Sequence, residues 1–97
     1  MNHKKRWCVY IVRCADETLY TGISNDYHQR IAQHNQGDGA KYTRSRTPVV
    51  LNYLRFGQNR SEVSQWEYQI KKLSRTQKEK LIISYKDQNQ STSTGMV

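Results

Sequence analysis

Two short segments rich in β-branched and aromatic residues, 8–14 and 19–24, follow each other with a mostly polar run of four residues, 15–18, between them. Side chains of these types favour strands, and a short polar connection between two such strands is typical of a β-hairpin. The sequence therefore predicts a hairpin, and with it a fold built on an antiparallel sheet.

The segments after the hairpin predict a helix and a third strand. Asn25 and Asp26 offer N-cap side chains, and Gly37 is a natural C-terminal stop, so we expect a helix over about 26–36. The apolar run 49–56 follows a loop and predicts the third strand.

Two more helices are expected after that strand. A helical apolar stripe, Val63, Trp66, Ile70 and Leu73, predicts a helix over about 61–73, with caps available at 59–61. A capping box of either Ser74 with Gln77 or Thr76 with Glu79 announces a third helix over about 76–86. The order β-β-α-β-α-α indicates an α+β fold, a small three-stranded antiparallel sheet flanked by helices.

The length of 97 residues suits a single domain, which we expect to span residues 1–86. The last segment, 87–97, holds no aromatic residue and little apolar mass, so it predicts a disordered polar tail. No window approaches the ~18 consecutive apolar residues of a membrane span, and the N-terminus lacks a signal-peptide core. A cytoplasmic protein is expected.

The cysteines and histidines indicate neither a disulfide nor a zinc site. Cys8 and Cys14 stand in one predicted strand, and at ~3.3 Å per residue they lie about 20 Å apart. There is no CxxC motif, and His3, His28 and His34 have no zinc-ligand spacing. Both cysteines are therefore interpreted as ordinary strand residues in a reducing compartment.

The charge balance favours a polyanionic partner. The chain has 16 Lys and Arg against 8 Asp and Glu, a formal net charge of +8, and nucleic acid is preferred to a membrane surface because no broad apolar helix face is left unpartnered. The loop 37–48 is the most basic one. The candidates for phosphate contacts are Lys41, Arg44, Arg46, Lys71 and Lys72, with Tyr42 as a stacking residue. A merely solvated charged surface is the alternative for each of them.

Residues that could carry chemistry stand on the first predicted helix and on the hairpin. Arg30 and His34 share the helix face that should pack on the sheet, where they need an anion such as a phosphate. In the alternative, Arg30 reaches solvent and His34 caps the helix end. Tyr10 and Tyr20 stand in the two hairpin strands, and Gly22 inside the second strand suggests a bulge or a close backbone approach to a ligand.

One carboxylate stands out on the second predicted helix. Glu67 lies at the edge of the apolar stripe, where it could hold a Mg²⁺ ion, which takes only one or two protein carboxylates. The alternative is an ion pair with Lys71, one turn further on. The sequence contains no P-loop, HExxH or GxSxG motif, so those enzyme classes are not indicated.

The joint order of these residues resembles the GIY-YIG nuclease superfamily. Three segments carry the resemblance: YxxxCxDxxLYTGIS over 10–24, GAKYT over 39–43, and ExxIKKL over 67–73. They are similar to those of the small stand-alone bacterial proteins of the YhbQ type, and the similarity covers about residues 7–86. The family's two triplets stand here as Cys8-Val9-Tyr10 and Tyr20-Thr21-Gly22.

The resemblance implies a metal-dependent endonuclease in which a water attacks phosphorus in line, next to one Mg²⁺ or Mn²⁺ ion held by Glu67. Arg30 would stabilise the transition-state charge, Tyr10 and Tyr20 would position the water, and either His34 or Tyr10 would be the general base. Phosphodiester hydrolysis needs these three elements: a base, a cation and a metal near the leaving oxygen. The implied substrate is DNA, cut structure-selectively in repair or recombination.

Two positions depart from the family's pattern. The last predicted helix has Glu79 or Ile82 where an Asn often stands, and Ile23 and Ser24 replace a lysine after the second triplet. One alternative function is therefore a catalytically weak or inactive nucleic-acid-binding module that needs a partner protein. Another is a subunit that gains activity when a partner orders the loop 37–48.

Overall fold

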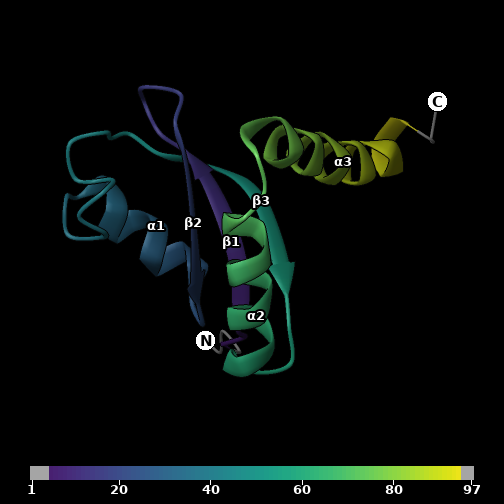
Figure 1. Cartoon of the computed structure of the whole chain (residues 1–97), viewed down its shortest axis with the longest axis horizontal. Helices are drawn as coiled ribbons and strands as arrows, with labels where there is room; N and C mark the ends of the chain where they lie inside the picture. Colours follow the sequence, from purple (N-terminus) through teal and green to yellow (C-terminus); the bar gives the residue numbers. More distant parts are fainter. Residues whose placement is uncertain (1–4, 95–97) are drawn as a thin grey trace.

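Three strands and three helices form the fold. The computed structural model describes residues 5–94, with side chains as far as residue 89. Along the chain the elements are β1 (Cys8–Arg13), β2 (Leu19–Ser24), α1 (Tyr27–Asn35), β3 (Val50–Phe56), α2 (Arg60–Lys71) and α3 (Arg75–Thr94) (Figure 1). This confirms the predicted α+β fold and its order of elements, and every strand lies within one residue of its predicted bounds.

The sheet has the order β2-β1-β3, and β1 pairs antiparallel with both neighbours. Tyr10 lies opposite Gly22 on β2 and opposite Leu54 on β3. The register with β3 shifts between Ile11 and Val12, where the extra residue of β3 makes a bulge. β1 is the central strand, and helices cover both of its faces. Its side chains therefore need to be apolar on both faces, and they form a nearly continuous buried run.

The two faces of the sheet carry different helices. Val9 and Ile11 of β1 belong to a core cluster with Val63 and Ile70 of α2 and Ile82 of α3. The alternate residues of β1, which include Tyr10 and Val12, form a second cluster that contains Ile31 of α1. Successive side chains of a strand point to opposite faces, so α1 covers one face and α2 and α3 pack on the other (Figure 1).

The helix starts follow the predicted capping chemistry. Asp26 accepts a hydrogen bond from the Gln29 amide at the start of α1, and Asn59 does the same for Glu62 at the start of α2. At α3 the Ser74–Gln77 box forms reciprocally, with distances of 2.9 and 3.1 Å. The Thr76–Glu79 alternative does not form, because the Glu79 carboxylate binds two arginines instead.

Helix α3 is longer than the sequence indicated. It extends to Thr94, although its end was predicted near residue 86. The physical reason is that no Gly or Pro interrupts residues 75–94, so the helical hydrogen bonding continues through a polar sequence. Residues 87–94 of the predicted tail are thus helical here, and residues 95–97 lie outside the described residues.

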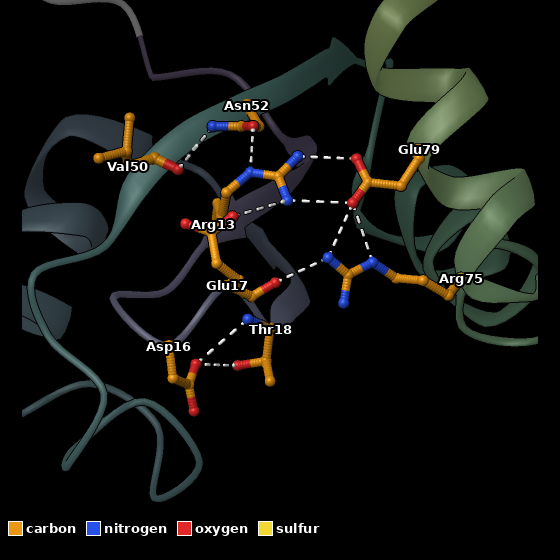
Figure 2. Close-up of polar contacts among 8 residues, drawn as sticks. All are labelled: Arg13, Asp16, Glu17, Thr18, Val50, Asn52, Arg75 and Glu79. Carbon is orange, nitrogen blue, oxygen red and sulfur yellow. Dashed lines mark hydrogen bonds and ion pairs between the residues drawn. The ribbon is translucent and has the colours of Figure 1, made fainter.

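An ion-pair network fixes α3 against the sheet (Figure 2). The Arg13 guanidinium donates two hydrogen bonds to Glu79, at 3.0 and 2.7 Å, and its Nε donates to Asn52, the extra residue at the β3 bulge, at 3.1 Å. Arg75 also binds Glu79 and reaches the Glu17 carbonyl oxygen in the β1–β2 turn, at 2.9 and 2.8 Å. The two arginines lower the pKa of Glu79 to about 2.

Both cysteines are buried and unpaired, in agreement with the prediction. Cys8 is on β1, whereas Cys14 follows the end of β1 and closes the turn through its amide, 2.8 Å from the Thr18 carbonyl oxygen. Among the described residues, no helix combines the length and the apolar character that crossing a membrane requires.

Candidate active site

The centre of the candidate site is a hydrogen-bonded pair under α1. The Tyr10 hydroxyl, from the middle of β1, lies 2.9 Å from Nε2 of His34, in the last turn of α1. The exposed fractions of the two residues are 1% and 0%. The structure therefore buries the imidazole against the sheet and does not leave it at the helix end as an exposed cation.

The other nitrogen of His34 binds the loop that follows α1. Nδ1 lies 2.8 Å from the Thr43 hydroxyl, and this hydroxyl lies 3.0 Å from the Ala40 carbonyl oxygen. Thr43 is itself fully buried. Both ring nitrogens of His34 thus have a partner within the chain, one from β1 and one from the loop.

Two glycines make room for this pair. A Cβ atom at Gly22 would lie 2.6 Å from the Tyr10 hydroxyl oxygen, and one at Gly39 would lie 2.8 Å from the Cα atom of His34. The sequence suggested a bulge or a close backbone approach to a ligand at Gly22. The structure shows a regular β1–β2 register there, and the group that approaches Gly22 is the side chain of Tyr10. Gly39 allows the loop to lie directly against the imidazole.

A second tyrosine extends the site toward the surface. The Tyr20 ring, on β2, meets the His34 ring edge-on with centroids 5.3 Å apart. The Tyr20 ring also stacks on the ring of Tyr42, with centroids 5.9 Å apart. The Arg46 guanidinium lies 4.1 Å from the ring centroid of Tyr42. Tyr42 is 39% exposed, so a line of aromatic rings connects the buried imidazole with solvent.

Burial and Arg30 set the protonation states of the pair. Burial raises the pKa of Tyr10 to about 12, although the Arg30 guanidinium beside it partly offsets this effect. Burial also lowers the pKa of His34, and the positive charge of Arg30 lowers it further. At neutral pH the phenol is therefore protonated and the imidazole neutral, so the imidazole can accept a proton.

Glu67 lies apart from this cluster. It is on α2, which packs on the opposite face of the sheet, and its carboxylate forms an ion pair with Lys71 at 3.2 Å. Both α1 and α2 contact the edge strand β2, from opposite faces of the sheet. The structure brings Tyr10, Tyr20 and His34 into contact, with Arg30 beside Tyr10, and does not bring Glu67 to them.

The metal expected at Glu67 would be a hard cation that keeps most of its water. Among the described residues there is no group of three or more His, Cys, Asp or Glu side chains that could form a protein cage for a metal. A Mg²⁺ ion does not need such a cage, since it is bound through one or two carboxylates, waters and substrate phosphates. Glu67 offers one carboxylate with 24% of the side chain exposed.

The basic residues proposed for phosphate contacts have different surroundings. Lys41 and Arg44 are exposed on the loop, next to Tyr42. Arg46 instead helps to hold the loop, through an ion pair with Asp16 at 2.9 Å and a hydrogen bond to the Tyr42 carbonyl oxygen at 2.8 Å. On α2, Lys71 pairs with Glu67, and just beyond the helix Lys72 lies 4.4 Å from the ring centroid of Tyr68.

Sequence reasoning missed part of the site. The GAKYT segment carries the family resemblance, but no role was expected for Gly39 or Thr43, which accommodate and hold His34. A hollow of about 610 Å³ at the start of α1 was also missed. Its lining includes Lys5, Arg6, Tyr27, His28 and Phe56. No spacing rule could have found this hollow, because its walls come from three separate segments.

Comparisons with known proteins agree with this architecture. A family model described as the GIY-YIG catalytic domain matches residues 6–80. A UPF0213 protein of Halobacterium salinarum is 53% identical over 73 residues, which are 75% of this chain and 95% of that protein. A UPF0213 protein of Clostridium perfringens is 55% identical over 76 residues, or 78% of this chain and 82% of that one.

Two solved structures are also similar. The solution NMR structure of a UPF0213 protein from Bacillus halodurans has a TM-score of 0.52 and 43% sequence identity, covering 79% of this chain and 82% of that chain. The solution NMR structure of a protein from E. faecalis has a TM-score of 0.59 and 36% identity, covering 88% and 91%. The chain therefore belongs to the GIY-YIG catalytic-domain family and, within it, to the UPF0213 proteins.

Proposed function

We propose that this protein is a divalent-metal-dependent endonuclease that hydrolyses phosphodiester bonds in DNA, selects DNA by its structure and acts in repair or recombination. The observation that carries the proposal is the buried Tyr10–His34 hydrogen bond with Arg30 beside it. A neutral base, a hydroxyl relay and a fixed cation on one face of the sheet suit the hydrolysis of a phosphodiester.

The proposed reaction uses the pair as one proton acceptor. His34 is fully buried, so a proton from the attacking water reaches it through Tyr10. The water oxygen bonds to phosphorus while the bond to the leaving oxygen breaks, and Arg30 stabilises the added negative charge on the phosphoryl oxygens. Arg30 is half-buried beside Tyr10 and donates a hydrogen bond to Gln33 at 3.2 Å, so the proposal is that a phosphate drawn to the guanidinium approaches the Tyr10 hydroxyl.

The metal is assigned to Glu67, whose carboxylate would exchange Lys71 for the ion. A bound Mg²⁺ or Mn²⁺ would neutralise charge at the leaving oxygen. Because α1 and α2, which carry His34 and Glu67, both contact the edge strand β2, the proposal is that the reacting phosphate lies over that edge.

The proposed DNA contacts surround the site. Lys41 and Arg44 are exposed beside the stacked Tyr42, and Lys5 and Arg6 line the hollow at the start of α1. Cationic side chains bind phosphates, and exposed aromatic rings beside them stack on bases. Neither contact reads the base sequence. Recognition would then depend on DNA shape or on a partner protein.

To test the proposal, DNA cleavage is measured after the protein is incubated with supercoiled plasmid or with labelled single-stranded, duplex or branched DNA, in the presence of Mg²⁺, Mn²⁺ or EDTA. Glu67→Ala should abolish metal-dependent cleavage and leave DNA binding equal or tighter, because a carboxylate that repels phosphate is gone. Arg30→Ala should reduce turnover more than affinity. Glu62→Gln is the matched control: it removes a carboxylate from the same helix and should keep cleavage.

The outcomes separate the candidate functions. Full cleavage by Glu67→Ala would remove Glu67 from the mechanism, and a loss of affinity without loss of turnover would make Arg30 a phosphate anchor. No cleavage by the wild-type protein, together with salt-sensitive DNA binding, would replace the nuclease by a binding module or by a nuclease that needs a partner.

A further inference from the structure

The geometry of the loop after α1 points to Thr43 as a positioning residue that fixes the tautomer of His34. In this inference the Thr43 hydroxyl accepts a hydrogen bond from Nδ1–H, which leaves Nε2 without a proton and facing Tyr10. The inference about the tautomer rests on the structure alone, and its consequence for the reaction rests on the proposed function.

The assignment follows from the number of protons available. A threonine hydroxyl has one proton, and the Ala40 carbonyl oxygen, 3.0 Å from Oγ1, can only accept it. Oγ1 is then the acceptor toward Nδ1, at 2.8 Å, so the imidazole proton is on Nδ1. Nε2 is in turn the acceptor for the Tyr10 hydroxyl, at 2.9 Å.

The opposite tautomer satisfies fewer groups. With the proton on Nε2, the ring would donate to the Tyr10 oxygen, and the Tyr10 hydroxyl proton would have no acceptor among the described residues. The Thr43 hydroxyl would turn toward Nδ1, and the Ala40 carbonyl oxygen would keep the Thr43 amide as its donor, at 3.2 Å. In return, Nδ1 could accept from the Ala40 amide, but this amide nitrogen is 3.4 Å away, at the long end for a hydrogen bond. Leaving the hydroxyl of the buried Tyr10 without an acceptor is unfavourable.

The loop holds Thr43 in place without a ligand. Asn35 binds the backbone of Val49 through two hydrogen bonds, at 2.6 and 3.2 Å, and so closes the loop on α1. The Arg46 carbonyl oxygen accepts from the Ala15 amide at 2.8 Å, which ties the loop to the β1–β2 turn. Since these hydrogen bonds lie within the chain, the tautomer is set before any substrate arrives.

The tautomer decides the direction of proton transfer in the proposed reaction. Tyr10 can donate its hydroxyl proton to Nε2 only if Nε2 is unprotonated. The Tyr10 oxygen can then accept the proton of the attacking water. His34 becomes an imidazolium with both nitrogens protonated, and it returns the proton through Tyr10 to solvent after the product leaves. Thr43 touches neither substrate nor water and acts only through His34.

The test combines the imidazole ¹⁵N spectrum with two matched variants. In the wild-type protein at neutral pH, the proton of His34 should be on Nδ1, and exposed His28 provides an internal reference. Thr43→Val keeps the shape and removes the hydroxyl, so His34 should lose the Nδ1–H signature and turnover should fall about ten- to hundred-fold with little change in KM. Thr43→Ser keeps the hydroxyl and should retain both.

The outcomes distinguish this inference from the proposed function. An Nε2–H tautomer in the wild-type protein would overturn the inference, whatever the activity. Normal turnover and an unchanged spectrum in Thr43→Val, with damage in Thr43→Ser, would show a packing role for the methyl group and would also overturn it. If the protein cleaves no DNA at all, the spectrum of the wild-type protein and of Thr43→Ser still decides the tautomer.

Discussion

Tyr10 and Arg13 are three residues apart on β1, so their side chains point to opposite faces of the sheet. Tyr10 enters a buried, neutral cluster with His34 and Thr43 under α1, in which each hydrogen bond joins uncharged groups. Arg13 enters a charged, partly exposed network with Glu79 on α3 (Figure 2). One strand thus carries the candidate chemistry on one face and a structural anchor on the other.

The difference shows what each kind of interaction is suited for. Neutral hydrogen bonds in a buried site depend on donor and acceptor geometry and respond little to salt. Partly exposed ion pairs tolerate small displacements, are screened by salt and contribute only about 0.2–1 kcal/mol. We expect the Tyr10 face to be sensitive to small changes of shape and the Arg13 face to be sensitive to salt.

The largest effect is expected from a single added methyl group. Gly22→Ala would place a Cβ 2.6 Å from the Tyr10 hydroxyl oxygen, so it should displace the relay and reduce DNA cleavage about 100-fold. Gly37→Ala is the control: the new Cβ has open space, and the φ of 85° makes the change costly for stability only. Equal activity losses in both variants would break the comparison.

The second effect concerns stability and acid. His34→Gln should lower the free energy of unfolding by about 1–3 kcal/mol, because buried partners lose their hydrogen bonds. The folded protein lowers the pKa of His34 below its ordinary 6.5, so the neutral form favours folding above pH 6.5, and this stability is lost as the pH falls below it.

Urea unfolding between pH 7 and 5 measures this dependence. The wild-type protein should lose more stability over that range than His34→Gln does. His28→Gln, which removes an exposed ring of the same helix, should behave like the wild type. The same loss in all three proteins would contradict a neutral, buried His34.

A smaller effect is expected on the charged face. Glu79→Gln should lower the free energy of unfolding by about 1 kcal/mol at pH 7, with no loss of cleavage. The folded protein lowers the pKa of Glu79 from 4.5 to about 2, so this stabilisation is present above pH 4.5 and disappears as the pH falls through 2. The difference between variant and wild type should therefore vanish in strong acid, and its persistence there would contradict the ion-pair interpretation.

The smallest effect is that of salt. Raising NaCl from about 0.1 to 1 M shortens the screening length from about 10 to 3 Å. The stability difference between wild type and Glu79→Gln should shrink by about 0.3 kcal/mol, and that between wild type and His34→Gln should stay the same. A salt-dependent His34→Gln difference would mean that the buried cluster carries charge.

Local patterns in the sequence were enough for the elements and for part of the site. The β-branched and aromatic run of β1, the apolar stripe of α2 and a capping box at the start of α3 are set by neighbours within a few residues, so they were predictable, although the sequence did not choose between the two possible boxes. The pattern also placed Arg30 and His34 on the helix face against the sheet. It could not choose between an exposed, capping His34 and a buried one.

The sequence by itself determined the order of the elements, the hairpin, the helix starts and the residues available for chemistry, because these depend on local periodicity and capping. Only the tertiary structure decided that Tyr10 binds His34, that Thr43 lies behind it, and that Glu79 binds Arg13 and does not cap its own helix. These interactions join residues between 9 and 66 positions apart, and such pairs are formed by the packing of helices on the two faces of the sheet.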